Sequence, residues 1–551
     1  MLLNDFELQN REQWESAGFS LPRFDRAAVR ERTKKEPVWL HLGAGNIFRA
    51  YPAVLQQRLL ETGLQDRGMI VAEGYDYEII DLAYTAYDDL SVSVTLKACG
   101  DTDKTIVASI VESIKMDDEG LERLKEIFAA GSLQLVSLTI TEKGYNLTGG
   151  DGATLPGVGE DFKAGPAAPK SYMGKLAALC YHRYENGAAP LALLSMDNCP
   201  QNGSRLFEAV RRFAAAWAGN GTADGGFLDY VDDPAKLAFP WSMIDKITPR
   251  PDDGVASMLK EAGLGNIEGK VTAKNTFIAP FVNSEESEYL VIEDAFPNGR
   301  PPLEETGVMM TSREIVEKTE KMKVGTCLNP LHTGLAVFGC LLSYTRISDT
   351  MRDETLRKLV RRIADEGLPV VVDPKIISPA EFIHTVINVR FPNPFVPDTP
   401  QRIATDTSQK ISARFGETLK SYLQGGMDTG GLKAIPLVIA GWCRYLLGLD
   451  DNREAFDISP DPMLPELKAL LKGDDLVQDS AHNGDVAGDV CGDVSGDIDI
   501  HKTLYPLLSN ASIFGVDLCE AGLSEKVEGY FASMIKGAGA VRKTLDTVLG
   551  S

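Results

Sequence analysis

Residues 38–49, VWLHLGAGNIFR, carry the pattern that decides the fold: a buried strand, a glycine-rich turn and the approach to a helix. Two glycines, Gly43 and Gly45, let the backbone bend sharply and approach a diphosphate, which the following amides can bind. The third glycine of the GxGxxG pattern is absent, because Phe48 stands in its place. A glycine turn without a ligand is the alternative. The candidate cofactor-binding residues of this turn are Gly43, Gly45, Asn46, Phe48 and Arg49.

A carboxylate ends the next predicted strand, which covers residues 68–74. Glu73 is the last polar residue of this strand, and Asp76 lies just beyond it. In a dinucleotide-binding fold, a carboxylate at the end of the second strand accepts hydrogen bonds from the adenosine ribose and repels a 2′-phosphate. Either Glu73 or Asp76 would therefore favour NAD over NADP.

Three further apolar runs are predicted to be strands of the same sheet, because they are continuous rather than alternating, as in strands covered on both faces. They cover residues 105–114, 133–141 and 191–197, and a last strand is predicted at 289–296. Polar clusters end two of these strands, where open α/β sheets bind ligands. The candidates are Thr141, Glu142 and Asn198, with Asp245 in a turn-like setting further on. Residues 149–169, rich in Gly, Ala and Pro, predict a loop or lid.

The second half of the chain is predicted to be mainly helical. The segment PNGRPP at 297–302 is the expected domain boundary. Helical periodicity then covers stretches such as 352–366, 411–424 and 432–447. A polar, proline-rich interruption at 393–410 carries Arg402 and Lys410. These two cations are either solvated or able to hold a carboxylate or several hydroxyls.

Residues 321–339 concentrate proton-transfer and hydrogen-bonding side chains, namely Lys323, Asn329 and His332. A capping box upstream predicts a helix over 312–322 that leaves Lys323 at its exit. The proline after Asn329 suits the start of a second helix, so Asn329 is expected to cap it and His332 to lie in its first turn. Helix ends have unpaired backbone groups that can hold a polar substrate. The alternative is a cap, a solvated cation and a surface histidine without a common role.

The composition is that of an ordinary globular protein, with 44% hydrophobic and 25% charged residues in a chain of 551. Its formal charge of -23 argues against binding to nucleic acid or to an anionic membrane. No apolar run reaches membrane-spanning length and the N-terminus lacks the pattern of a signal peptide, so we expect a cytoplasmic protein. Eight scattered cysteines without a CxxC pair indicate reduced thiols and no structural zinc site. A Gly-Asp repeat at about 482–499 predicts an acidic surface loop.

Six motifs, in order, resemble the polyol-specific long-chain dehydrogenases, the family of mannitol 2-dehydrogenase, fructuronate reductase and tagaturonate reductase. The resemblance covers nearly the whole chain. Its motifs are GAGNIFRA in the glycine turn, VSLTITEKGY at 136–145, SMDNCPQNG at 195–203, FPWSMIDKITP at 239–249, the cluster of Lys323, Asn329 and His332, and the pair Arg402 and Lys410.

The resemblance implies a fold of two parts. These are an α/β N-terminal Rossmann-type NAD-binding domain at 1–300 and a mainly α-helical, substrate-binding C-terminal domain at 301–551, with a substrate cleft between them. It also implies an NAD(P) cofactor, for which Glu73 and Asp76 favour NAD, no metal, and a small-molecule sugar acid or polyol as the substrate. We expect a monomer or a small homo-oligomer.

The resemblance also implies a set of site residues. They are a lysine as general acid/base, an acid three residues earlier, two asparagines on the reacting oxygen, a histidine that orients the substrate and two cations at the far end of the sugar. In this sequence they correspond to Lys323, Glu320, Asn198 with Asn329, His332, and Arg402 with Lys410. Hydride transfer to a ketone builds negative charge on the carbonyl oxygen, which amide donors and a cationic acid stabilise.

The sequence departs from this pattern between the lysine and the asparagine. The family has four residues there and a glycine after the asparagine. In this chain five residues separate Lys323 from Asn329, and Pro330 follows. Either a local bulge absorbs the extra residue, or the catalytic lysine is Lys321.

The resulting prediction is an NAD-dependent reductase that interconverts a keto-hexuronate, fructuronate or tagaturonate, and the corresponding aldonate. The GNxxRA form of the glycine turn and the cations Arg402 and Lys410 favour a uronate. The alternatives are a mannitol-type polyol 2-dehydrogenase, an enzyme of oxidative decarboxylation of a β-hydroxy acid, and a catalytically silent NAD-binding protein marked by the altered lysine spacing.

Overall fold

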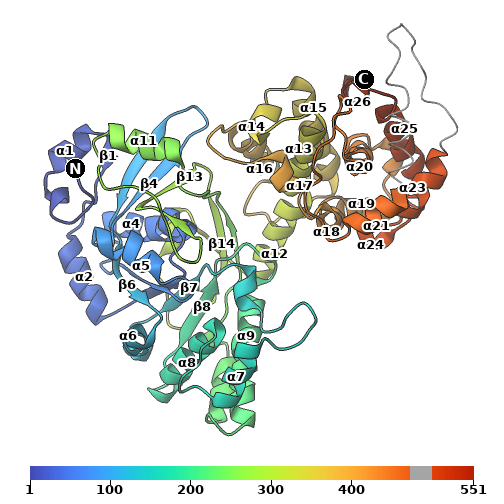
Figure 1. Ribbon diagram of the computed structural model, residues 1–551. Coiled ribbons are helices and arrows are strands. Elements are labelled where there is room, and N and C mark those ends of the chain that lie inside the picture. The colour runs from blue at the N-terminus through green and yellow to red at the C-terminus, as the bar shows by residue number, and fades with distance from the viewer. Residues whose placement is uncertain (472–498, 551) are drawn as a thin grey trace. The chain divides into compact units, whose positions relative to one another are not determined.

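The structure is a computed structural model that describes residues 1–471 and 499–550 (Figure 1). By its internal contacts the chain divides into two units, Met1–Glu317 and Lys318–Ser551. The first unit combines strands and helices, and the second is mainly helical. Apart from Asp499, the acidic repeat predicted at about 482–499 lies outside the described residues.

The core of the first unit is a six-stranded parallel sheet with the strand order β6-β3-β2-β7-β8-β9. Counted along the chain, this is the 3-2-1-4-5-6 order of a dinucleotide-binding fold. The strands are β2 (Trp39–Leu42), β3 (Met69–Glu73), β6 (Ile110–Lys115), β7 (Leu135–Leu138), β8 (Leu191–Ser195) and β9 (Leu237–Ala238). The glycine turn follows the central strand β2, so the order of the strands places it at the point where the direction of winding reverses.

Helices cover both faces of this sheet, which explains why its strands are continuously apolar. One apolar cluster joins Leu40 and Ile70 to residues of α6 (Asp118–Ala129), α8 (Tyr172–Glu185) and α9 (Asn202–Gly219). The neighbouring strand residues Trp39 and Val71 point the other way, into a second cluster with α4 (Pro52–Glu61) and α5 (Glu78–Ala83). Adjacent residues therefore serve opposite faces, and both faces are buried.

The run 105–114, predicted as one strand, forms two strands in different sheets. Its first part belongs to β5 (Thr102–Val107) in a four-stranded sheet of order β1-β5-β4-β13, whose other strands are β1 (Phe19–Ser20), β4 (Ser91–Leu96) and β13 (Phe281–Glu285). Its second part is the edge strand β6 of the main sheet. The prediction of a single strand is therefore wrong.

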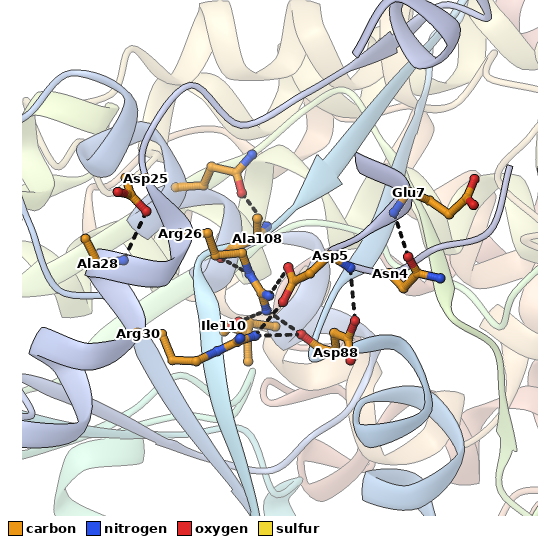
Figure 2. Close-up of polar contacts among 11 residues, drawn as sticks. Asn4, Asp5, Glu7, Asp25, Arg26, Ala28, Arg30, Asp88, Ala108 and Ile110 are labelled. Carbon is orange, nitrogen blue, oxygen red and sulfur yellow. Dashed lines mark hydrogen bonds and ion pairs between the residues drawn. The ribbon is translucent and has the colours of Figure 1, made fainter. Parts of the chain in front are cut away.

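A buried arginine of α2 (Arg26–Lys35) sits at the break between β5 and β6 (Figure 2). Arg26 donates hydrogen bonds from Nε to the carbonyl of Ala108, at 3.1 Å, and from Nη2 to the carbonyl of Ile110, at 3.0 Å. The same guanidinium also contacts the Asp5 carboxylate and the Asp88 carbonyl. Because these carbonyls bond to a side chain, the backbone leaves one sheet there and enters the other.

Three other segments of the first unit differ from their prediction. Residues 149–169 contain helix α7 (Pro156–Ala164) rather than only a loop. The strand predicted at 289–296 is β14 (Tyr289–Glu293), and it is not the last, because β15 (Met309–Thr311) pairs with it in parallel. This pairing carries the first unit past the expected boundary at 297–302. Asp245 is the buried last residue of β10 (Ser242–Asp245), which is antiparallel to β14, and so does not lie in a turn.

The second unit is built around two buried helices, α13 (Asn329–Leu341) and α20 (Ala434–Tyr445). Helix α13 packs against α15 (Glu354–Gly367), α17 (Pro400–Ala404) and α20, and α20 packs against α25 (Ser524–Met534). The remaining α-helices of the described residues are α12 (Arg313–Met322), which begins before the boundary, α14 (Ile347–Thr350), α16 (Pro379–Thr385), α18 (Thr407–Ile411), α19 (Glu417–Gln424), α21 (Leu464–Leu471), α23 (Ile500–Leu508), α24 (Ala511–Phe514) and α26 (Ala540–Gly550). The predicted mainly helical character is confirmed.

The helical run Arg313–Leu341 has the length and composition that a membrane-crossing helix needs, although the sequence contains no continuous apolar run. In the structure 78% of its most apolar window is buried inside the protein. Core helices of globular proteins pass the same length and composition test, and we interpret this run as a core helix.

Candidate active site

The turn after β2 meets the geometric demands of a glycine turn. Gly43 has a φ of +107°, and a Cβ at this position would lie 2.3 Å from the carbonyl oxygen of Thr139. Gly45 precedes helix α3 (Asn46–Ala50), and a Cβ there would meet nothing within 4 Å. The first glycine is therefore required by the fold, whereas the second leaves open space beside the backbone. Such space suits the close approach of a diphosphate.

Glu73 holds this turn from the end of β3. Its buried carboxylate accepts hydrogen bonds from the backbone N–H groups of Ala44 at 2.8 Å, Tyr75 at 2.8 Å and Asp76 at 3.1 Å. The carboxylate of Asp76, also buried, accepts one from the Thr272 hydroxyl at 2.6 Å. Both predicted ribose-binding acids therefore lie at the end of β3, and Glu73 also ties this end to the glycine turn.

The other residues of the turn face the protein interior. The Phe48 ring stacks on His41 with 4.2 Å between ring centroids, and Arg49 donates to the carbonyl of Ala279 at 2.6 Å and to Asn46 Oδ1 at 3.0 Å. Both Phe48 and Arg49 are fully buried. Their side chains therefore support the turn from the protein interior, and their predicted part in cofactor binding, which falls to the backbone of the turn, stays a prediction.

Asp197 joins the carboxyl ends of β7 and β8. It accepts hydrogen bonds from the backbone N–H groups of Ile140 at 3.0 Å and Thr141 at 2.8 Å and from the Tyr145 hydroxyl. Burial raises the pKa of Asp197, and these hydrogen bonds oppose the rise. Thr141 has a φ of +65° under this constraint. The predicted Asn198 follows Asp197 and is exposed at the end of β8.

Glu142 and Asp245, which were also predicted to bind the cofactor, differ in their exposure to solvent. Glu142 is exposed and forms an ion pair with Arg205 at 2.8 Å. Asp245 is 6% exposed at the end of β10.

Lys323, from the cluster of Lys323, Asn329 and His332, does not lie at the end of a helix. Lys323 begins a π-helical turn, η5 (Lys323–Cys327), in which the N–H of Leu328 donates to the Lys323 carbonyl at 3.1 Å. Such a turn is how a helix absorbs one extra residue. Helix α13 starts after Leu328, which occupies the N-cap position without a side-chain capping bond, and Asn329 is its first residue. The predicted helix end and the predicted Asn329 cap are therefore wrong, because the helix continues through a bulge.

Burial separates the two candidate lysines. Lys323 is 3% exposed, whereas Lys321, near the end of α12, is exposed, and Glu320 is partly buried. Lys323 is therefore not a solvated cation at the end of a helix, which was the alternative interpretation of the sequence.

His332 is enclosed by charged and aromatic side chains. Its Nε2 lies 3.5 Å from the Asp398 carboxylate, and its ring is 4.9 Å from that of Phe391, centroid to centroid. Burial lowers the pKa of His332 to about 4, Asp398 opposes this, and nearby arginines lower it further. Nε2 is buried and makes no hydrogen bond within the described residues. His332 is therefore a neutral imidazole at pH 7 and not a surface residue.

Three arginines act on this histidine, two of which the sequence did not indicate, and Lys410 lies near two of the three. Arg402 forms an ion pair with Asp398, and Lys410 donates to the carbonyl of Thr405 at 2.8 Å. The positive charges that act on His332 belong to Arg402, Arg414 and Arg390, and those that act on Lys410 belong to Arg414 and Arg402. Arg414 lies four residues after Lys410, a helical spacing that could have indicated it.

Three π-helical turns contribute to this cluster: η5, η7 (Val386–Arg390) and η8 (Ser412–Gly416). The first begins with Lys323, the second ends with Arg390 and the third contains Arg414. Turns η5 and η8 pack against each other. π-Helical turns are rare and concentrate at functional sites, so their convergence marks this region of the second unit.

The described residues contain no group of three or more His, Cys, Asp and Glu side chains that could hold a metal ion. The second unit instead offers a buried lysine, Lys323, and a neutral histidine, His332, on which several arginines act. Such groups can transfer a proton, hydrogen-bond hydroxyls and bind an anion.

Comparison with known families matches both units. The family model of the mannitol dehydrogenase Rossmann domain matches residues 38–305, and that of the mannitol dehydrogenase C-terminal domain matches 316–490. A D-mannonate oxidoreductase of Thermotoga maritima is 50% identical over 555 aligned residues, which cover 100% of this chain and 99% of that protein. A D-mannonate oxidoreductase of Escherichia coli is 28% identical, covering 80% of this chain and 86% of that protein.

Solved structures agree with this match. The mannitol 2-dehydrogenase of Pseudomonas fluorescens, in a ternary complex with NAD and D-mannitol, superposes with a TM-score of 0.69 at 26% identity, with 100% of both chains covered. A D-sorbitol dehydrogenase in substrate-free form has a TM-score of 0.78 at 23% identity, covering 98% of this chain and 100% of that one. The second likeness concerns the fold alone.

Proposed function

The chain belongs to the mannitol dehydrogenase family and is an NAD-dependent dehydrogenase acting on CH–OH groups, and we propose that its substrate pair is a keto-hexuronate and the corresponding aldonate. The observation that carries this proposal is the group of cations at His332, because a sugar acid brings a carboxylate that a polyol lacks. The names of the relatives from Thermotoga maritima and Escherichia coli support D-mannonate as the aldonate, and thus fructuronate over tagaturonate.

The glycine turn of the first unit fits a dinucleotide. Gly45 leaves room beside the backbone, and the paired acids Glu73 and Asp76 oppose a 2′-phosphate, so we propose a preference for NADH over NADPH. When bound, NADH supplies the hydride that the ketone carbon accepts. All other steps fall to side chains of this chain.

Lys323 is the proposed general acid and base. In reduction it gives a proton to the ketone oxygen as that oxygen gains charge, and in oxidation it removes the proton from the hydroxyl. Burial at the start of η5 excludes water from it, and Glu320, one turn earlier, is the proposed relay to solvent. Asn329 is the proposed donor to the same oxygen, which it would stabilise in the transition state.

His332 and the cations hold the rest of the substrate in this proposal. The neutral imidazole can both accept and donate a hydrogen bond, which suits a hydroxyl group. Arg402 and Lys410 would contact the end of the sugar chain that is remote from the ketone. Free thiols at the seven described cysteines suit a reducing compartment, and we propose that the enzyme works in the cytoplasm.

A mannitol-type polyol 2-dehydrogenase is the second candidate. The observation in its favour is that Arg402 is already neutralised by Asp398, and an ion pair of this kind can bind hydroxyls at the chain end. This candidate predicts that a neutral polyol is the better substrate.

Oxidation assays with NAD separate the two candidates. We expect D-mannonate to be oxidised with a higher kcat/KM than D-mannitol, measured as the formation of NADH. A higher value for D-mannitol would favour the second candidate, and turnover of neither would point to a cofactor-binding protein without activity on these sugars. Release of carbon dioxide during oxidation would instead indicate a β-hydroxy acid decarboxylase.

A further inference from the structure

We propose that Arg414 is the residue that receives the substrate's carboxylate and thereby selects sugar acids over neutral polyols. The inference rests on the proposed function, because it assumes that a hexuronate binds at His332. It assigns the recognition of charge to a residue that the sequence motifs do not contain.

Hydrogen bonds place Arg414 at the first turn of α13. Its Nη1 donates to the Thr333 hydroxyl at 2.5 Å, and that hydroxyl donates to the Asn329 carbonyl at 2.8 Å. Thr333 is buried and directly follows His332. The guanidinium is therefore connected, through one side chain, to the turn that carries two proposed substrate-binding residues.

Arg414 is a partly buried cation that has no acidic partner among the described residues. Burial lowers its pKa to about 10, and no carboxylate in the described residues forms an ion pair with it. A buried charge without a counterion is costly, and an anionic ligand that pairs with it removes that cost. Only Nη1 makes a hydrogen bond to the described protein, so further guanidinium N–H groups remain for the two oxygens of a carboxylate.

The other cations are less suited to this role. Arg402 has 61% of its side chain exposed and is paired with the Asp398 carboxylate. Lys410 is bonded to a backbone carbonyl, and an ammonium cannot hold a carboxylate in the two-pronged manner of a guanidinium. Of Arg402, Lys410 and Arg414, it is Arg414 on which no carboxylate of the described residues acts.

His332 supplies an independent sign that a polar ligand belongs here. Its Nε2 is buried and lacks a hydrogen-bond partner in the described structure, which is uncommon for a buried polar atom. The charge of Arg414 acts on the same imidazole. A sugar acid whose hydroxyl meets Nε2 and whose carboxylate meets Arg414 would satisfy both groups.

The test compares kcat/KM for NADH-dependent reduction of fructuronate and of fructose in Arg414→Gln, Arg414→Lys and the wild type. Arg357→Gln, at an exposed arginine on α15, is the matched control. We expect Arg414→Gln to lower kcat/KM for fructuronate about 100-fold and for fructose less than about threefold, since only the acid loses a charge-assisted pair. Arg414→Lys keeps the positive charge but lacks the two parallel N–H donors of a guanidinium, so we expect it to recover part of the loss in kcat/KM for fructuronate.

NADH binding, followed by fluorescence, and the unfolding temperature report whether the variants fold. Unchanged fructuronate turnover in Arg414→Gln overturns the proposal and leaves the proposed function intact. Equal losses on both sugars in both Arg414 variants overturn it in favour of a structural role. A wild type that reduces no hexuronate overturns the proposed function itself.

Discussion

Glu73 should couple the end of strand β3 to the glycine turn after β2. One oxygen of its carboxylate accepts the Ala44 N–H, and the other accepts the N–H groups of Tyr75 and Asp76. Glu73→Gln keeps the shape of the side chain but replaces one oxygen with an NH2 group, which cannot accept. In the better orientation the amide oxygen keeps two bonds, and the NH2 faces the Ala44 N–H.

The expected cost is that of one buried donor left unsatisfied, about 1–3 kcal/mol. If the lost hydrogen bond distorts the glycine turn, we expect the Kd for NADH to rise about tenfold, because a tenfold change in Kd corresponds to about 1.4 kcal/mol. Fluorescence titration with NADH measures the Kd, and thermal unfolding measures stability. Glu12→Gln, at an exposed glutamate of α1 (Arg11–Ser16), is the control and should change neither. An unchanged Kd in Glu73→Gln, with or without a loss of stability, would refute the coupling.

Three further predictions concern the lysine, the histidine and the glycine turn. Lys323→Ala should lower kcat about 100-fold or more, as expected for a general acid, whereas Lys321→Ala should leave it nearly unchanged; the reverse result would reassign the lysine. The pKa of His332 is lowered to about 4 in the folded protein, so the unfolded chain binds the proton first as the pH drops below about 6.5. The free energy of unfolding should therefore fall by up to about 3 kcal/mol between pH 6.5 and pH 4. In denaturation experiments at a series of pH values, His332→Gln should flatten this part of the stability curve. Gly43→Ala should lower both stability and NADH affinity, because the position has a positive φ and no room for a Cβ. Gly45→Ala should lower NADH affinity alone. A loss of stability in Gly45→Ala would contradict the open space beside Gly45.

The sequence predicted those parts of the fold that depend on local pattern. The strand–turn–helix at Gly43, the strand ending in Glu73 and the helical second half follow from glycine chemistry and apolar periodicity, and the structure contains them. The two-part organisation, an α/β unit followed by a helical one, is also present. These features need no information about distant residues.

The errors arise where distant residues decide. A strand run at 105–114 has the same composition whether it serves one sheet or two, and it is the Arg26 guanidinium, far away in the sequence, that bonds to the carbonyls at the break. Likewise, β15 could not be expected from three residues, because its partner β14 lies in another segment.

The sequence singled out the motif residues of the candidate site, whose roles stay predictions, but not the arginines near His332. Lys323, Asn329 and His332 were identified by type and spacing, but spacing alone could not decide between a helix end and a π-helical turn. Arg414 was missed because a lone arginine in a helical stretch is usually solvated. Its significance comes from partial burial with no acidic partner among the described residues, which only tertiary structure shows.

The kcat/KM of the wild-type enzyme for NADH-dependent reduction of fructuronate, divided by that for fructose, tests the central claim most directly. The two sugars differ in the group at the end remote from the ketone, so the ratio reports recognition of the carboxylate by the cations at His332. The account predicts a ratio well above one. A ratio at or below one would contradict a hexuronate reductase and assign the enzyme to neutral polyols.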